Sequence, residues 1–363
     1  MEIMKKVLIL TSEKTGSGHK SSANAIEKKL RDAGYDCRQI DVFPLMGRIG
    51  HVMEDSYIPL TTGSPLVYYL CQRFSQFFPD ILHTFICIRL KKEFLKVIDE
   101  YRPDLILSVH CMFTKAISWI IRSQQLNIPF YITVIDLIDP PRVWQDRKAD
   151  MSFLPSEEVY RSYLKKGFDR ERIMVSGFPV RDDIAPRRTP KKLSDPLKIL
   201  MLNPSTDLQK NIRFLQQVSR LDNFRTSFIC GLDDRLHDTL VGMQKMGELP
   251  QSLEICGFVG NVNEYLEDCQ IVLTKAGPNA IIEAVRSGCA VVITGHINGQ
   301  ENHNYRFVVD NGYGIRCEDP QRIYDTLNDL IHSGKLKDCL EKTVTHGIGN
   351  GAEVIADYVS NHI

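Results

Sequence analysis

Short apolar runs alternate with amphipathic segments along the whole chain. The run KVLIL at residues 6–10 is typical of a buried strand. A helix ending at Gly34 is predicted next, by an apolar stripe at Ala23, Ile26, Leu30 and Ala33. Further strand-like runs recur at residues 104–109, 130–135, 151–155, 173–177, 197–202, 226–230, 252–256, 271–274 and 290–294. This alternation predicts an α/β protein in which helices cover parallel sheets.

The segment RDDIAPRRTPKKLSDP, residues 181–196, interrupts this alternation. It is rich in proline and charge and has no apolar periodicity, which is typical of a domain boundary. We therefore expect an N-terminal domain at residues 1–185, a second domain at 196–345, and a C-terminal helix at 346–363 that packs back on the first domain. Ligands of parallel sheets bind at the carboxyl ends of the strands, so two such domains are expected to face each other across a cleft.

Residues 56–88 differ in composition from the rest of the chain. Only Arg73 and Asp80 are charged among these 33 residues, and seven are aromatic. Periodicity alone does not place an apolar helix face, so the segment fits a pair of core helices. It equally fits a surface that makes peripheral contact with a membrane, where aromatic rings are stabilised at the interface.

Composition is that of a soluble globular protein, with 43% apolar and 25% charged residues among 363. The formal net charge is zero, which argues against a nucleic-acid partner held by overall charge. Ten cysteines are scattered without a Cys-x-x-Cys pair, as expected in a reducing compartment. No leader peptide or run of ~18 apolar residues is apparent. We expect a cytoplasmic protein that is soluble or associates peripherally with the inner face of the cell membrane.

The sequence TSEKTGSGHK, residues 11–20, follows the first predicted strand. Glycines in such a turn let backbone N–H groups approach an anion closely. The dinucleotide fingerprint is incomplete, because Ser21 stands where a third glycine or alanine belongs, and the phosphate-loop pattern is absent. His19 is the candidate reactive side chain. As alternatives, it caps the helix or binds a phosphate as a cation.

The stretch QIVLTKAGPNAIIEAVRSGCAVVITG, residues 270–295, predicts a strand, a tight turn and a helix. Pro278 occupies the first helical position and Gly288 ends the helix. Backbone amides of Asn279, Ala280 and Ile281 are expected to point at an anion, with help from the helix dipole. Glu283 lies one turn further on, where it is placed to accept hydrogen bonds from ribose hydroxyls or, alternatively, only to complement the dipole.

A polar cluster follows in NGQENHNYRFVVDNGYGI, residues 298–315. Gln300, Glu301 and Asn304 precede another predicted helix, and such groups read sugar hydroxyls through hydrogen bonds. The alternative is an ordinary helix start capped by Asn298 or Asn302.

These motifs together resemble the monogalactosyldiacylglycerol synthase family, which includes processive diacylglycerol glucosyltransferases and is related to the peptidoglycan GlcNAc transferase. The matching stretches are residues 16–30, 154–181, 257–269, 273–285 and 299–315. The resemblance implies a GT-B architecture of two Rossmann-like domains and an inverting transfer of a hexose from a UDP-sugar to a membrane lipid hydroxyl, with diacylglycerol as the expected acceptor.

Carried onto this chain, the resemblance assigns roles to individual residues. In the donor half these are Phe258 and Val259 beside the uracil, Lys275, Gly277, Pro278, Asn279 and Ala280 at the diphosphate, Glu283 at the ribose, and Gln300, Glu301 and Asn304 at the sugar. In the acceptor half, His19 would be the catalytic base, with Gly16, Gly18, Asp136 and Trp144 binding the acceptor.

No cofactor and no metal are expected, because the sequence contains no Asp-x-Asp triplet to hold a divalent ion against the diphosphate. Helix-terminus amides would then stabilise the leaving group. Two alternatives stay open. The same donor chemistry fits a polyprenyl lipid or a small metabolite as acceptor. A silent nucleotide-sugar-binding protein is the other, since Asn279–Ala280 and Asn203–Ser205 depart from the family pattern.

Overall fold

The computed structural model describes residues 4–14, 17–56, 67, 70, 73, 77–297, 301–345 and 348–363. Its chain forms two compact units, which are described separately. The first unit contains the residues up to Arg181 together with Gly349–Ile363, and the second contains Asp182–Ile297 and Glu301–Ile348. The contact division therefore falls at the start of the proline-rich segment 181–196.

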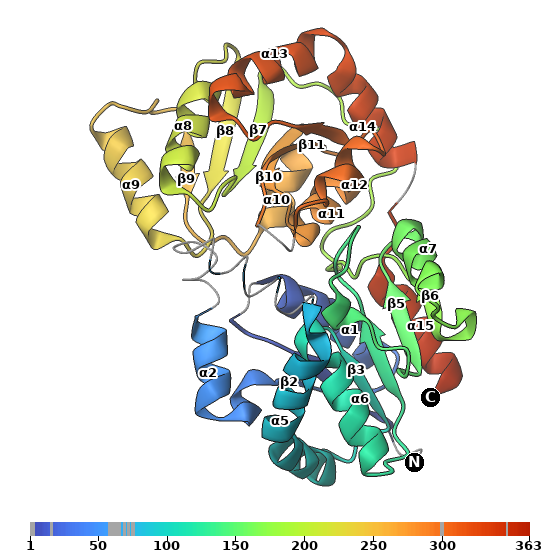
Figure 1. Ribbon diagram of the computed structural model, residues 1–363. Helices are drawn as coiled ribbons and strands as arrows, with labels where there is room; N and C mark the ends of the chain where they lie inside the picture. The colour runs from blue at the N-terminus through green and yellow to red at the C-terminus, as the bar shows by residue number, and fades with distance from the viewer. Residues whose placement is uncertain are drawn as a thin grey trace. The chain divides into compact units, whose positions relative to one another are not determined.

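The first unit is built on a six-stranded parallel sheet with the order β2-β1-β3-β4-β5-β6 (Figure 1). Its strands are β1 Lys6–Thr11, β2 Asp36–Asp41, β3 Leu105–Ser108, β4 Phe130–Thr133, β5 Met151–Leu154 and β6 Ile173–Val175. Its helices are α1 Ser17–Asp32, α2 Arg48–Asp55, α5 Pro79–Tyr101, α6 Thr114–Ser123, α7 Glu157–Lys165 and α15 Gly351–His362, with the short 3₁₀ turns η1 Phe43–Met46, η2 Cys111–Phe113, η3 Arg142–Trp144 and η4 Arg170–Arg172.

The second unit repeats the design, with a parallel sheet in the order β12-β11-β10-β7-β8-β9. Its strands are β7 Leu197–Leu202, β8 Phe224–Ile229, β9 Glu254–Cys256, β10 Ile271–Lys275, β11 Ala290–Gly295 and β12 Gly314–Arg316. Its helices are α8 Leu208–Val218, α9 Asp234–Lys245, α10 Val262–Asp268, α11 Pro278–Arg286, α12 Tyr305–Val309, α13 Ile323–His332 and α14 Lys335–Thr345, with the 3₁₀ turn η5 Pro320–Arg322.

The sequence prediction of two Rossmann-like parallel-sheet units is confirmed. Each predicted apolar run overlaps a strand, and the helix predicted from Ala23 to Ala33 is α1, which Gly34 follows at a φ of +92°. The central strands are apolar throughout because helices bury both faces of the sheet. Residues of β10 and β11 such as Leu273 and Val292 are completely buried. The carboxyl ends of these strands carry the polar side chains of interest.

The C-terminal helix α15 belongs to the first unit, where it packs against α1. In Figure 1 it is the red helix among the green elements of that unit. Asn350 fixes its start: the side chain accepts from the Val180 amide at 3.0 Å and donates to the Val180 carbonyl at 2.9 Å. A methyl group on Gly351 would lie 2.4 Å from the carbonyl oxygen of Gly177, so only glycine fits there.

Candidate functional site

In the first unit, His19 lies in the first turn of α1, just beyond the carboxyl end of β1, and its side chain is buried. Its Nδ1 is 2.7 Å from the carbonyl oxygen of Val109, the residue after β3. A carbonyl oxygen only accepts hydrogen bonds, so this contact assigns the proton to Nδ1. Nε2 therefore keeps its lone pair and is the nitrogen able to take a proton from a substrate.

Burial lowers the pKa of His19 from 6.5 to about 4, while the hydrogen bond to Val109 acts in the opposite direction. This differs from the unperturbed value that a solvated histidine would have, because α1 and the loop after β3 enclose the ring. A neutral imidazole is a proton acceptor but a poor phosphate ligand. The bond to Val109 and the position of His19 inside α1 disfavour the alternative in which this side chain caps the helix, and phosphate binding stays an alternative.

An aromatic cluster surrounds His19. The ring centroid of Trp144 is 6.2 Å from that of His19, and the Trp144 indole N–H donates to Asp136 Oδ2 at 2.5 Å. Asp136, just after β4, is buried and fixes the orientation of the indole. Asp136 and Trp144 thus lie with His19 at one end of the sheet. Gly18 precedes His19 in α1, whereas Gly16 lies outside the described residues.

His110 is a member of this cluster that sequence reasoning missed. Its ring centroid is 4.3 Å from that of His19, and burial lowers its pKa well below the usual value. Its Nδ1 accepts the Met112 amide at 3.3 Å, so Nε2 carries the proton and is a donor. The sequence did hold one signal for His110: it comes directly after residues 104–109, which are predicted to form a buried strand.

Two acidic side chains hold the start of the glycine-rich loop. Glu54 on α2 accepts from the Ser12 hydroxyl at 3.2 Å and from the Lys14 amide at 3.0 Å. Asp41 at the end of β2 accepts the amide of Glu13 at 3.1 Å. Burial and a hydrogen bond with Glu54 raise the pKa of Asp41 to about 6. These carboxyl groups position residues 12–14, the described start of that loop.

In the second unit, the turn between β10 and α11 has the predicted geometry at its start. Gly277 is the N-cap residue and Pro278 the first helical residue. The expectation for Ile281 is wrong: its amide donates to the Gly277 carbonyl at 3.1 Å, which is the first hydrogen bond of the helix. The first-turn amides that the helix itself leaves for a ligand are those of Asn279 and Ala280.

Backbone and side-chain bonds hold this turn in place. The Ala276 amide donates to the Gly295 carbonyl at 2.8 Å, and Asn304 Nδ2 donates to the Ala276 carbonyl at 3.0 Å. Asn304 is buried, so its amide group is committed to the protein backbone. Asn304 therefore positions the turn through its Nδ2, and the sugar contact expected from the sequence stays a prediction.

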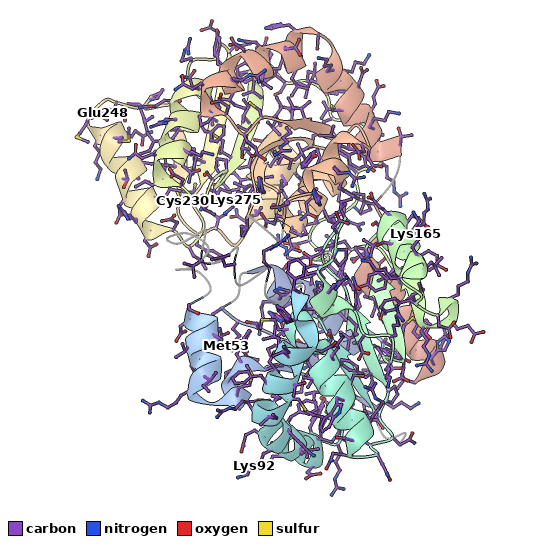
Figure 2. The ribbon with its side chains drawn as sticks, viewed as in Figure 1. Met53, Lys92, Lys165, Cys230, Glu248 and Lys275 are labelled. Atoms are coloured by element: carbon purple, nitrogen blue, oxygen red, sulfur yellow. The ribbon has the colours of Figure 1, made fainter. Side chains whose placement is uncertain are left out.

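Lys275 and Glu301 flank the same turn. Lys275 is the last residue of β10. Figure 2 labels it at the carboxyl end of the sheet, the same end at which Cys230 follows β8. Burial lowers the pKa of Lys275, and burial raises the pKa of Glu301. Glu301 Oε2 accepts the Ile297 amide at 2.8 Å, and a methyl group on Gly277 would lie 3.6 Å from Oε1. This carboxylate therefore adjoins the turn.

The other predicted donor residues are spread more widely along the second half of the chain. Glu283 is half-buried and lies beyond the first turn of α11, so the dipole alternative has little support. Phe258 and Val259 follow the edge strand β9, and the Phe258 side chain is 72% exposed. The sheet order separates β9 from β10 by β8 and β7. Gln300 lies outside the described residues.

The departure at Asn203–Ser205 has a structural explanation. Asn203 has a φ of +37°, a left-handed conformation that asparagine tolerates better than other side chains. Asn211 Nδ2 donates to Asn203 Oδ1 at 3.0 Å and to the Ser205 carbonyl at 2.8 Å. The loop after β7 is thus closed by its own polar network instead of by glycines.

Within the described ranges, no group of three or more His, Cys, Asp or Glu side chains is arranged to hold a metal ion. The absence of a metal requirement stays a prediction. Across the same residues, every helix is too short or too polar to span a bilayer.

Comparison with known families and proteins agrees with this architecture. Residues 19–180 match the family Monogalactosyldiacylglycerol (MGDG) synthase, and residues 190–358 match the Glycosyltransferase family 28 C-terminal domain. Monogalactosyldiacylglycerol synthase 3, chloroplastic, of Arabidopsis thaliana is 29% identical over 361 residues, which cover 92% of this chain and 76% of that protein. A probable monogalactosyldiacylglycerol synthase of Nicotiana tabacum is 28% identical, over 88% of this chain and 63% of its own length.

Solved structures with the same fold are more distant in sequence. MurG of Acinetobacter baumannii superposes with a TM-score of 0.67 at 15% identity, covering 98% of this chain and 99% of that one. The UDP-GlcNAc 2-epimerase of Neisseria meningitidis, described with UDP-GlcNAc bound, gives 0.62 at 13% identity over 98% of this chain and all (100%) of that chain. These similarities establish the GT-B fold, which the sequence predicted.

Proposed function

We propose that the chain is a glycosyltransferase of the monogalactosyldiacylglycerol synthase type with a family 28 C-terminal domain, and that it moves a hexose from a UDP-sugar to a membrane lipid hydroxyl. Diacylglycerol is the acceptor we favour, since the curated relatives are named for that product. We further propose that the transfer inverts the anomeric centre and needs no metal ion.

The observation that carries this proposal is the 2.7 Å contact between His19 Nδ1 and the Val109 carbonyl. It leaves Nε2 as a fixed acceptor at the carboxyl end of the sheet. In the proposed reaction, Nε2 takes the proton of the acceptor hydroxyl as its oxygen attacks the anomeric carbon. The bond from that carbon to the diphosphate oxygen breaks on the opposite face, and UDP leaves with the electron pair.

The second unit would hold the leaving group. Developing negative charge on the diphosphate is stabilised by the amides of Asn279 and Ala280 and by the α11 dipole, with the Lys275 side chain alongside. Glu283, one turn further along α11, is proposed to accept hydrogen bonds from the ribose hydroxyls. Phe258, exposed after β9, offers a flat apolar surface for the uracil.

We also propose that the first unit contacts a membrane through the described part of segment 56–88, as a cytoplasmic protein at the inner face of the cell membrane. One face of α5 is in the core, where Ile86 and Leu90 are completely buried. Another face is apolar and exposed. Its members, with residues just before the helix, are Phe77, Phe78, Ile81, Phe85 and Ile88, at 40–73% exposure.

A basic cavity adjoins this apolar face. It measures about 750 Å³, lies beside α5 and α6, and contains two carboxylates, Asp80 and Asp146. Six basic side chains line it: Lys91, Lys115, Arg122, Arg142, Arg147 and Lys148. Exposed apolar side chains beside an excess of positive charge favour adsorption to an anionic lipid surface.

A single assay tests the proposed function. The protein is incubated with diacylglycerol-containing vesicles and UDP-glucose, UDP-galactose or UDP-GlcNAc in turn, and the lipid and aqueous fractions are analysed by mass spectrometry. A hexosyl-diacylglycerol product with one donor supports the proposal, and the NMR coupling of its anomeric proton reports inversion. Product confined to the aqueous fraction indicates a soluble acceptor. UDP binding without product from any donor indicates a silent protein.

A further inference from the structure

A buried lysine and two cysteines form a cluster in the second unit. Lys191, in the connecting segment, is 5% exposed, and its Nζ lies 3.1 Å from Cys289 Sγ. The same Nζ donates to the Cys269 carbonyl at 2.5 Å and to the Leu266 carbonyl. These three contacts use all three N–H groups of the ammonium.

The charge of Lys191 requires a counter-ion in this interior position. Its two carbonyl partners are neutral. The adjacent carboxylate, Asp268, pairs instead with Lys198 at 2.5 Å. The Cys289 sulfur is then the one contacting group of Lys191, among the described residues, that is able to carry a negative charge.

The sulfur atoms of Cys269 and Cys289 are 3.6 Å apart, in contact but unbonded. Each cysteine lies just before a strand, β10 or β11, and these strands are paired neighbours. Shortening the distance to the ~2.05 Å of a disulfide calls for small side-chain movements between segments already held side by side.

The two thiols differ in acidity. Burial acts to raise the pKa of Cys289, but the Cys269 hydrogen bond and the Lys191 charge outweigh it and lower the pKa to about 7. Burial raises the pKa of Cys269 well above its usual value. The Lys191 ammonium, 3.1 Å from its sulfur, favours Cys289 as the nucleophile, and Cys269, whose sulfur lies 3.6 Å away, is placed to resolve its oxidised form.

We propose that Lys191, Cys269 and Cys289 form a redox-sensitive site that a peroxide converts to a disulfide. The Cys289 thiolate attacks one oxygen of hydrogen peroxide, forming sulfenic acid and releasing hydroxide. The Cys269 sulfur then attacks the Cys289 sulfur, the S–S bond forms, and the sulfenic hydroxyl leaves as water with the Cys269 proton. Two thiols and one peroxide give one disulfide and two waters.

Oxidation also changes the electrostatics of the connecting segment. The disulfide removes the negative charge beside Lys191 and leaves its ammonium buried among neutral groups, which is unfavourable. Residues around Lys191 are then held less firmly against α10 and β11. This site is separate from the proposed transferase chemistry, so either proposal stands if the other fails.

Intact-mass and peptide mass spectrometry after treatment with hydrogen peroxide test the site. We expect loss of two hydrogens, mapped to a Cys269–Cys289 cross-link, while Cys37 stays a thiol. Cys37 is a matched internal control, because it is also buried and burial raises its pKa to about 12. In Cys269→Ser, Cys289 should instead be trapped by dimedone as the sulfenic acid. A reduced Cys269–Cys289 pair under conditions that oxidise other cysteines would overturn the proposal.

The rate at which Cys289 reacts with peroxide tests the role of Lys191. Lys191→Met should slow the reaction of Cys289 with peroxide at pH 7 about tenfold, because less of the thiol is ionised. The pH dependence of the wild-type rate gives a second measurement that needs no substituted protein: the rate should rise through pH 7. A rate that is flat between pH 6 and 8 and unchanged in Lys191→Met contradicts a thiolate at Cys289.

Discussion

The rings of His19 and His110 lie with their centroids 4.3 Å apart, and the adjacent backbone gives them opposite hydrogen-bonding roles. Val109 accepts from His19 Nδ1, which leaves Nε2 as an acceptor. Met112 donates to His110 Nδ1, which makes Nε2 of that ring a donor. The first unit thus presents a neutral base and a neutral donor side by side.

Replacement of His19 tests the base directly. His19→Ala should lower kcat ~10²–10⁴-fold with a nearly unchanged KM for the sugar donor, because the proton of the acceptor hydroxyl loses its acceptor. His332→Ala, at an exposed histidine, is the matched control. Steady-state kinetics with a UDP-sugar provide the measurement. A mutant with normal kcat and a raised donor KM would assign His19 to phosphate binding instead.

The buried histidines predict acid sensitivity of the fold. Burial lowers the pKa of both His19 and His83 to about 4, so the unfolded chain binds more protons between pH 6.5 and 4. The stabilisation is complete above pH 6.5 and is lost as the pH falls through this window, by about 3 kcal/mol for His19. Asp41, with its pKa raised to about 6, offsets part of the loss, since its folded form binds the extra proton.

Urea unfolding at pH 7, 6 and 5 measures this effect. We expect the free energy of unfolding to fall at each step, and His83→Gln to make the fall shallower. His332→Gln should leave the pH dependence unchanged, because that side chain is exposed. Equal unfolding free energies at pH 7 and pH 5 would contradict the prediction.

Glu283 is predicted to bind the donor nucleotide. Glu283→Ala should weaken UDP binding by ~1–3 kcal/mol, the range for losing hydrogen bonds to a charged group. Isothermal calorimetry with UDP provides the measurement, and Glu248→Ala, at an exposed glutamate of the same unit, is the control. Unchanged affinity in a folded Glu283→Ala protein would remove this residue from the site.

Turnover is predicted to be independent of metal ions. Activity with a UDP-sugar should survive EDTA, because the amides of Asn279 and Ala280 and the Lys275 side chain supply the positive charge at the diphosphate. Initial rates of sugar transfer, measured before and after chelation with EDTA, test this prediction. Activity that is abolished by EDTA and restored by magnesium or manganese would be incompatible with this arrangement.

Membrane contact is predicted for the exposed aromatic residues before α5. Phe77→Ser with Phe78→Ser should reduce sedimentation with anionic liposomes and leave UDP binding intact. Both side chains are at least half exposed, so the change should not unfold the protein. The control is Leu232→Ser with Met246→Ser, which removes two exposed apolar side chains from the second unit. Wild-type liposome binding by the Phe77–Phe78 variant would show that these two side chains do not contact the membrane.

The sequence predicted the central strands because burial on both faces requires uninterrupted apolar runs such as residues 271–274. It did not predict β2, an edge strand with the polar sequence DCRQID, or β12, which has three residues. Edge strands have less surface to bury, so their pattern is weak. Local patterns identified α1, and Gly34 marked its end.

Single functional residues were easier to predict than their partners. His19 follows a strand and a glycine turn, which is a local signal. Its contacts with Val109 and His110 span about ninety positions of sequence and exist because β3 pairs beside β1. The lowered pKa of His19 likewise depends on enclosure by these distant segments. The hydrogen bond from Asn304 to the Ala276 carbonyl is also a tertiary contact, and no sequence spacing predicts it.

The return of α15 to the first unit has a consequence for biosynthesis. A ribosome releases residues 4–181 long before it makes Asn350, whose side chain closes on Val180, and α15, which covers part of α1. In the nascent first unit, the surface of α1 that α15 later covers therefore stays exposed while about 170 further residues are translated, at about 5–20 residues per second. Apolar side chains of α15 such as Ile355 then complete the oldest part of the chain last.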